Sequence, residues 1–182
     1  GQEPSGGCID NSTAVAAMVS LSAIPSDTLA YKKQIIITSS TTFTVSVQYY
    51  SDASCATLTG YFNLLYANFS VGDSLSGLSA GSNPAKPTTA KKVSYNEQSL
   101  ALNCNTDACT TFFNSTFTAS ALSTLGYTQG TELLVTNCCD PEVNIWETSD
   151  MSWSSKTYLV TGNSAESTYP DNWTSASVYW QE

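Results

Sequence analysis

Apolar and hydroxyl-bearing side chains alternate from Thr41 to Val71, and this alternation predicts two consecutive strands. In the first half of the stretch, polar residues separate Phe43, Val45, Val47 and Tyr49. Successive side chains of a strand point to opposite faces, so one face here is apolar and the other is rich in hydroxyls. We therefore expect the four apolar side chains to point into one core.

The second half of this stretch begins after the polar turn 51–54. Its apolar residues share one parity, which predicts a second half-buried strand; they are Tyr61, Leu65, Ala67, Phe69 and Val71. Two such runs joined by a short polar turn are typical of an antiparallel hairpin or meander with one buried face.

Further strands are expected where β-branched and aromatic residues cluster. They lie at 35–37, 93–102, 112–117, 132–137, 145–146, 156–161 and 175–180. Residues 72–89 contain three glycines and two prolines among serines, which predicts a long surface loop with at most a short helical turn. The pattern indicates an all-β fold, an antiparallel β-sandwich or barrel of about nine or ten strands tied by disulfides.

The segment from Ala14 to Ile24 fits two interpretations. It is either a short helix capped by Ser12 or Thr13, or a buried strand, and the β-rich surroundings favour the strand. We divide the chain into residues 1–24, an N-terminal arm or first strand anchored by Cys8, and residues 25–182, a single β domain.

Charge and hydropathy exclude several partners. The net charge is −9 with only six basic residues, so no basic stripe exists to neutralise phosphates, and we expect neither nucleic acid nor an anionic membrane surface as a partner. No apolar run approaches the roughly 20 residues that span a bilayer. Only 12% of residues are charged, whereas 52 of the 182 are Ser or Thr. Neutral hydroxyl groups therefore make the surface hydrophilic in place of charged side chains.

Histidine is absent, and this removes the commonest general base near neutral pH. The remaining enzymatic chemistry is a carboxylate pair, for which the candidates are Asp140 with Glu142 and Glu147 with Asp150. The cluster 140–144 also offers oxygen ligands for calcium, but it lacks the spacing of an EF-hand loop. We interpret these acids as solvated turn residues and expect no enzyme activity, no metal site and no cofactor.

Six cysteines, an even number, are typical of an oxidised, secreted protein; they are Cys8, Cys55, Cys104, Cys109, Cys138 and Cys139. The spacing of Cys104 and Cys109 permits a small closed loop. A ring between the neighbours Cys138 and Cys139 is strained, so we expect each to bond a different partner. Our pairing hypothesis joins them to Cys55 and to one of Cys8, Cys104 or Cys109.

Sequons for N-linked glycans begin at Asn11, Asn68, Asn114 and Asn172. For Asn68, we expect the flanking residues to point inward and the asparagine to face solvent. The chain starts at Gly1 without a methionine, which we interpret as a mature chain whose signal sequence was removed. Together with the cysteines, this predicts a secreted, extracellular glycoprotein.

The four tryptophans all lie in the last 37 residues. Trp146 and Trp180 fall within strand patterns and are expected in the core. Trp153 and Trp173 lie in serine-rich segments and are expected to be more open, where they would stack on sugars or anchor an interface.

Residues 1–12, the apolar segment Ala14–Leu21, the sequons and the alternating strands together resemble subunits of extracellular glycosylated protein filaments recovered from natural water samples. This resemblance implies a non-enzymatic structural glycoprotein that forms a homo-oligomer or filament through its N-terminal segment. The alternative is a monomeric binder, either a lipocalin-like barrel or a carbohydrate-binding β module. The Gly-x-Trp expected near the first lipocalin strand is missing.

Overall fold

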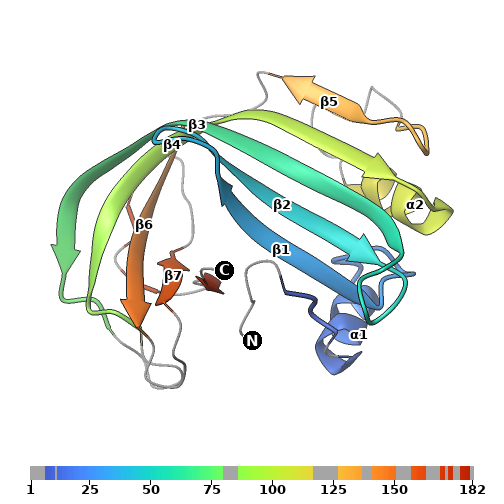
Figure 1. Ribbon diagram of the computed structural model, residues 1–182, viewed down its shortest axis with the longest axis horizontal. Coiled ribbons are helices and arrows are strands. Elements are labelled where there is room, and N and C mark those ends of the chain that lie inside the picture. Colours follow the sequence, from blue (N-terminus) through green and yellow to red (C-terminus); the bar gives the residue numbers. More distant parts are fainter. Residues whose placement is uncertain are drawn as a thin grey trace.

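The backbone forms one antiparallel sheet that curls into an arch, with two short helices at one end (Figure 1). The computed structural model describes residues 7–10, 12–79, 86–116, 127–136, 141–150, 157–162, 169–170, 172–173 and 177–180. The elements in chain order are α1 (Ser12–Ser20), β1 (Ala30–Ile37), β2 (Phe43–Tyr50), β3 (Leu58–Ser76), β4 (Thr89–Cys104), α2 (Asp107–Thr116), β5 (Leu133–Thr136), β6 (Pro141–Asp150), β7 (Thr157–Thr161) and β8 (Ser177–Trp180).

Seven strands follow one another across the sheet in the order β1-β2-β3-β4-β6-β7-β8, and β5 pairs with β4 beside this path. The prediction of a mostly antiparallel β protein is therefore confirmed. The described residues hold fewer than the nine or ten strands expected, and they form a single curled sheet instead of two facing sheets.

The hairpin predicted from the alternating pattern is present. β2 pairs with β3 in a register that places Val45 opposite Leu64 and Val47 opposite Phe62. In the connecting turn, the Asp52 carboxylate accepts hydrogen bonds from the backbone N–H groups of Ser54 at 3.0 Å and Thr57 at 2.6 Å. An aspartate in this position accepts hydrogen bonds from backbone N–H groups that, because they lie in the turn, have no partner on the neighbouring strand.

The inner face of the arch is the main core. Phe43 and Val45 pack in an aromatic cluster with Tyr66, Tyr95 and Trp146. Further along the same face of β2, Val47 and Tyr49 pack with residues of β4 and the two helices, including Leu102, Cys109 and Phe113. The expectation that the alternating residues of β2 share one buried face is confirmed.

The parity predicted for the second strand of the hairpin is wrong in its first half. Phe62, Leu64 and Tyr66 lie on the inner face, since their β2 partners do, whereas Tyr61 and Leu65 lie on the other face. The register then shifts between Ala67 and Ser70, next to Asn68 with a φ of 54°. A bulge adds one residue to one strand and so exchanges the faces that follow it. Phe69 consequently packs on the aromatic cluster.

The segment expected as a first strand is a helix. α1 spans Ser12–Ser20, so the choice of a strand for Ala14–Ile24 was wrong. Val15 is buried, and Met18 and Val19, three and four residues further, pack on the same core, which is the spacing of one helix face. Val15 and Ile24 join the core of the sheet. The apolar face of α1 is therefore used within the subunit itself, whereas Leu21, just beyond the helix, is exposed.

A second expected strand, 112–117, is also helical over its described part. α2 begins after Thr106, whose hydroxyl accepts a hydrogen bond from the N–H of Cys109 at 3.3 Å, as a helix cap does. Cys109 and Phe113, four residues apart, are its buried residues. Over six residues, a period of two and a helical period are hard to tell apart, and here the cap and the packing favour the helix.

Two disulfides are formed among the described residues, Cys8–Cys55 and Cys104–Cys109. The small loop closure that the spacing of Cys104 and Cys109 permits is present. Because Cys55 is bonded to Cys8 and Cys104 to Cys109, our hypothesis that joins Cys138 and Cys139 to Cys55 and to one of Cys8, Cys104 or Cys109 was wrong in both pairings. Cys138 and Cys139 themselves lie outside the described residues.

The far arm of the arch has a small core of its own on the outer face, where Ile145 of β6 and Val160 of β7 pack with Trp173. Trp173 is only 5% exposed, and its indole N–H donates to the carbonyl of Pro87 at 2.7 Å. The expectation that it is open was wrong. Trp146 is buried as expected, while Trp153 and the side chain of Trp180 lie outside the described part.

Candidate functional site

The outer edge of β1 is the first candidate, because β1 is one of the two terminal strands of the described sheet, with β8 at the other end. Ile9 pairs with Tyr31 on this edge through hydrogen bonds of 2.9 and 3.2 Å. Along β1 the register is regular, so the backbone N–H and C=O groups of Ile35 and Ile37 also point outward. Among the described residues they have no hydrogen-bond partner.

Exposed apolar side chains accompany this open edge. Ile36 is 45% exposed and Ile37 is 63% exposed, at the end of β1 that is remote from Ile9. Lysines often protect an edge strand from pairing with another chain. Here Lys32 and Lys33 place their ammonium groups over aromatic rings of the same subunit, at 5.5 Å from the centre of Tyr50 and 5.4 Å from that of Tyr179. The end of β1 beyond them carries no charge.

β5 presents a second open edge. It pairs only with β4 in the described part of the chain, and Leu134 in its centre is 58% exposed. β5 lies on the opposite side of the sheet from β1, since β2 and β3 stand between β1 and β4. Among the described residues, β1 and β5 thus present open edges with exposed apolar side chains on different sides of the sheet.

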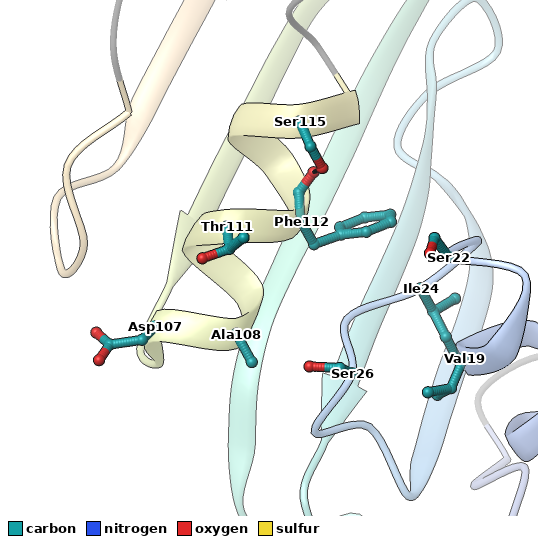
Figure 2. A pocket seen from close by; sticks show the side chains of 9 residues that line it. All are labelled: Val19, Ser22, Ile24, Ser26, Asp107, Ala108, Thr111, Phe112 and Ser115. Carbon is teal, nitrogen blue, oxygen red and sulfur yellow. Dashed lines mark hydrogen bonds between the residues drawn. The ribbon is translucent and has the colours of Figure 1, made fainter.

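A hollow between the two helices is the third candidate. It has a volume of about 310 Å³ and lies between α2 and the chain that leaves α1. Figure 2 shows the ring of Phe112 between the two walls, with Ser22 and Ile24 facing α2. Its lining consists of Val19, Ser22, Ile24, Ser26, Asp107, Ala108, Thr111, Phe112 and Ser115.

A second hollow of about 460 Å³ shares Val19 and Ser26 with the first and extends along the other side of α1. Its walls are more apolar, with Val15, Ala16 and Leu29 among them. Both hollows depend on α1, which sequence reasoning interpreted as a strand. The helical spacing of Ala108, Thr111 and Ser115 was available in the sequence, but it becomes one wall only once α2 is recognised as a helix.

The aromatic cluster on the inner face is tightly packed. Phe43 stacks on Tyr66 with ring centres 4.7 Å apart, and the Tyr66 hydroxyl donates to Glu97 at 3.0 Å. Burial, with a further contribution from the nearby Glu97 carboxylate, raises the pKa of Tyr66 far above its usual value of 10.0. Tyr66 therefore remains a neutral hydrogen-bond donor at any physiological pH.

The candidate acids do not form a turn cluster. Glu142, Asn144 and Glu147 lie on strand β6, and the Asn144 amide donates to the hydroxyl of Tyr95 at 3.2 Å. Asp140 and the side chain of Asp150 lie outside the described residues. Within the described part, no group of three or more acids or cysteines is placed to hold a metal ion, and no helix is long and apolar enough to cross a membrane.

Three of the four sequon asparagines are described, and all three are exposed: Asn68, Asn114 and Asn172. The expectation that Asn68 faces solvent next to a buried Ala67 is confirmed. The Asn114 side chain accepts a hydrogen bond from the Tyr127 N–H at 3.1 Å, so it is engaged within the subunit. Asn11 lies outside the described residues.

Comparison of the chain with models of known protein families and with curated proteins finds no match to either.

Proposed function

We propose that this protein is a secreted, non-enzymatic structural glycoprotein whose subunits assemble into extracellular filaments by pairing their open sheet edges. The observation that carries the proposal is the uncharged, solvent-exposed end of β1, with outward backbone groups at Ile35 and Ile37 and exposed side chains at Ile36 and Ile37. An open edge of this kind pairs readily with another strand unless it is blocked.

The contact is not made by the apolar segment Ala14–Leu21, because α1 uses its apolar face within its own subunit. Instead, β1 of one copy pairs with β5 of the next, so that the exposed Ile36 and Leu134 become neighbours in one continuous sheet. Two different surfaces are joined in such a contact. A head-to-tail contact that does not close into a ring propagates as a filament.

Secretion and glycosylation are supported separately. The two disulfides agree with folding in an oxidising compartment. The asparagines at 68, 114 and 172 are exposed, and none of them lies on β1 or β5. We expect a loss of mass when protein from its native source is treated with an N-glycosidase; an unchanged mass would contradict the glycoprotein part of the proposal.

The assembly is tested by charging one edge at a time. Ile37→Lys and Leu134→Lys each place a charge on an exposed position, so both variants should fold normally and fail to form filaments by negative-stain electron microscopy. Leu21→Lys is the matched control, because Leu21 is 78% exposed and lies on neither edge. This variant should form filaments like the wild type.

Mixing the two edge variants makes the test specific. The Ile37→Lys subunit keeps an intact β5 edge and the Leu134→Lys subunit an intact β1 edge, so an equimolar mixture should give dimers that grow no further. Light scattering after gel filtration measures this. A wild type that is monomeric at every concentration, or filaments that persist in both edge variants, would overturn the proposal.

A further inference from the structure

The open edge of β1 begins where an earlier segment of the same chain already lies. Ile9 pairs with Tyr31 in one antiparallel bridge, and the two residues exchange both backbone hydrogen bonds, at 2.9 and 3.2 Å. The described chain begins two residues before this bridge, at Gly7, and residues 1–6 lie outside the described part. Residues 1–6 are therefore joined to a segment that is fixed beside the edge of β1.

The bridge defines a register for these six residues against β1. In an antiparallel pair, each step back along one strand is a step forward along the other, and pairs that exchange both hydrogen bonds recur at every second residue. Continued from the bridge, this register places Ser5 opposite Ile35. Two residues further, Glu3 would lie opposite Ile37. Ile35 and Ile37 are the residues whose outward backbone groups have no hydrogen-bond partner among the described residues.

The position of Pro4 agrees with the parity of this register. Even-numbered residues of the segment would direct their N–H groups away from β1, so the N–H that proline lacks is not needed for pairing. Pro4 would stand opposite Ile36, at a pair without mutual hydrogen bonds, where facing side chains come closest. Its apolar ring would then cover an isoleucine that is 45% exposed.

The other strand of the subunit that comes near this edge is β8. The Lys33 ammonium of β1 lies 5.4 Å from the ring centre of Tyr179 on β8, so side chains of the two terminal strands meet. Every pairing from β1 through β2, β3, β4, β6 and β7 to β8 is antiparallel, so β1 and β8 run in the same direction. Among the described residues no ladder joins them, whereas Ile9 already makes backbone hydrogen bonds to β1.

We propose that residues 1–6 pair with the edge of β1 in their own subunit and cap its end at Ile35–Ile37. Pairing within the subunit is favoured because the Cys8–Cys55 disulfide and the bridge hold the beginning of the segment at this edge. A short tether of this kind gives an effective concentration on the order of millimolar, which a segment of another copy does not reach in dilute solution.

The cap would turn an open edge into a protected one. Proline and charged residues on an edge strand discourage pairing with a further strand, and the new outer edge would carry Pro4 and Glu3. Gly6 and Gly7 weaken the pairing, since glycine loses the most conformational freedom when it is ordered. The cap is therefore displaceable. Its regulatory consequence rests on the proposed function: β5 of the next copy must displace residues 1–6 before it pairs with β1.

NMR on a monomeric host tests the cap without reference to filaments. The host is the full chain with Leu134→Lys, which leaves β1 and residues 1–6 unchanged, at a concentration where light scattering shows monomers. We expect an NOE between the α-protons of Pro4 and Ile36, and slowed hydrogen exchange of the Ile35 and Ile37 N–H groups. The absence of this NOE, with both amides exchanging at the rate of unprotected ones, would overturn the proposal.

Two proline substitutions test the register by parity. Ser5→Pro removes an N–H that the ladder needs, whereas Gly6→Pro, the matched control, removes one that points away from β1. Ser5→Pro should speed exchange of the Ile35 and Ile37 amides about tenfold, which corresponds to the net strength of one or two backbone hydrogen bonds. Gly6→Pro should leave both rates close to those of the host. Equal effects of the two variants, or protection that appears only as dimers form, would overturn the proposal.

Assembly is measured separately, by light scattering on chains that keep Leu134. Ser5→Pro should form filaments after a shorter lag than Gly6→Pro, because its β1 edge is uncapped. Filaments that form with equal lags would overturn the regulatory consequence. If no chain forms filaments while the NOE and the exchange pattern are as expected, the cap is supported and the filament proposal alone fails.

Discussion

Gly60 of β3 is a position where a single methyl group tests the packing of the helical end of the sheet. It pairs with Cys104 on β4 and lies against Cys109 of α2. A Cβ at this position would lie 2.2 Å from the Cys109 sulfur and 2.8 Å from the Asn103 carbonyl oxygen. Neither atom is at the end of a flexible side chain, because the sulfur is held in the buried Cys104–Cys109 disulfide and the oxygen belongs to the backbone.

The expected cost follows from two opposing effects. Overpacking a tight site costs roughly 1–3 kcal/mol, and two unavoidable contacts place Gly60→Ala at the upper end of that range. Replacing a strand glycine by alanine otherwise gains roughly 0.5–1 kcal/mol of conformational entropy. We therefore expect a net loss of about 2 kcal/mol, which for a chain of this size lowers the melting temperature by roughly 4–8 °C.

Gly72→Ala is the matched control, since Gly72 lies on the same strand and its added Cβ would meet only ordinary contacts at 3.6 Å or more. Guanidinium unfolding of both variants measures the difference, and Gly72→Ala should be neutral or slightly stabilising. Combining Gly60→Ala with Cys104→Ala and Cys109→Ala removes the obstructing sulfur, so the alanine should cost less in that background. A Gly60→Ala variant as stable as Gly72→Ala would refute this description of the packing.

Three further changes test other parts of the structure. Hydrogen bonds from the Ser54 hydroxyl and from the Thr57 and Ala56 N–H groups hold the pKa of Asp52 well below its ordinary value of 3.8, so the stability they contribute is present above pH 4 and is lost as the pH falls towards the lower folded-state value. Asp52→Asn should accordingly flatten the dependence of unfolding free energy on pH below 4, and an unchanged acid profile would contradict this. Phe43→Ala removes the centre of the aromatic cluster and should cost roughly 3–5 kcal/mol in denaturant unfolding, whereas a cost below 1 kcal/mol would mean that the cluster is not packed as described. Trp173→Phe keeps an aromatic ring but loses the hydrogen bond to the Pro87 carbonyl; a destabilisation of about 1 kcal/mol is expected, and a melting temperature equal to that of the wild type would speak against the bond.

Several features of the fold were predictable from the sequence. The period of two in Phe43–Tyr49 predicts the strand, its buried face and, with the polar turn at 51–54, the hairpin. This succeeds because strand alternation and a turn are local properties, and burial of one face agrees with both. The spacing of Cys104 and Cys109 permitted the short loop that the structure closes, but it did not select this pairing over the others.

The candidate sites were predictable only in part. The cluster Ile35–Ile37 predicts a strand, but nothing in those residues shows that the strand lies at the edge of the sheet, since the strand order is decided by pairing between distant segments. The hollow between the helices was also not predicted from the sequence. Phe112 belongs to a run that alternates like a strand, and Ser22 and Thr111 meet only after α1 and α2 have packed on the same end of the sheet.

The sequence by itself determined a disulfide-tied, hydroxyl-rich antiparallel β protein without histidine, because composition and short-range alternation depend on no distant partner. The tertiary structure alone decided that the segment beginning at Ala14 forms a helix whose Val15 packs within its own subunit, that the bulge at Asn68 exchanges the faces of β3, and that β1 ends the sheet with Ile36 and Ile37 exposed. Each of these depends on which distant segment a residue meets. Burial against that segment, worth roughly 1.5–3 kcal/mol for a large apolar side chain, outweighs local propensities of at most about 1 kcal/mol per residue.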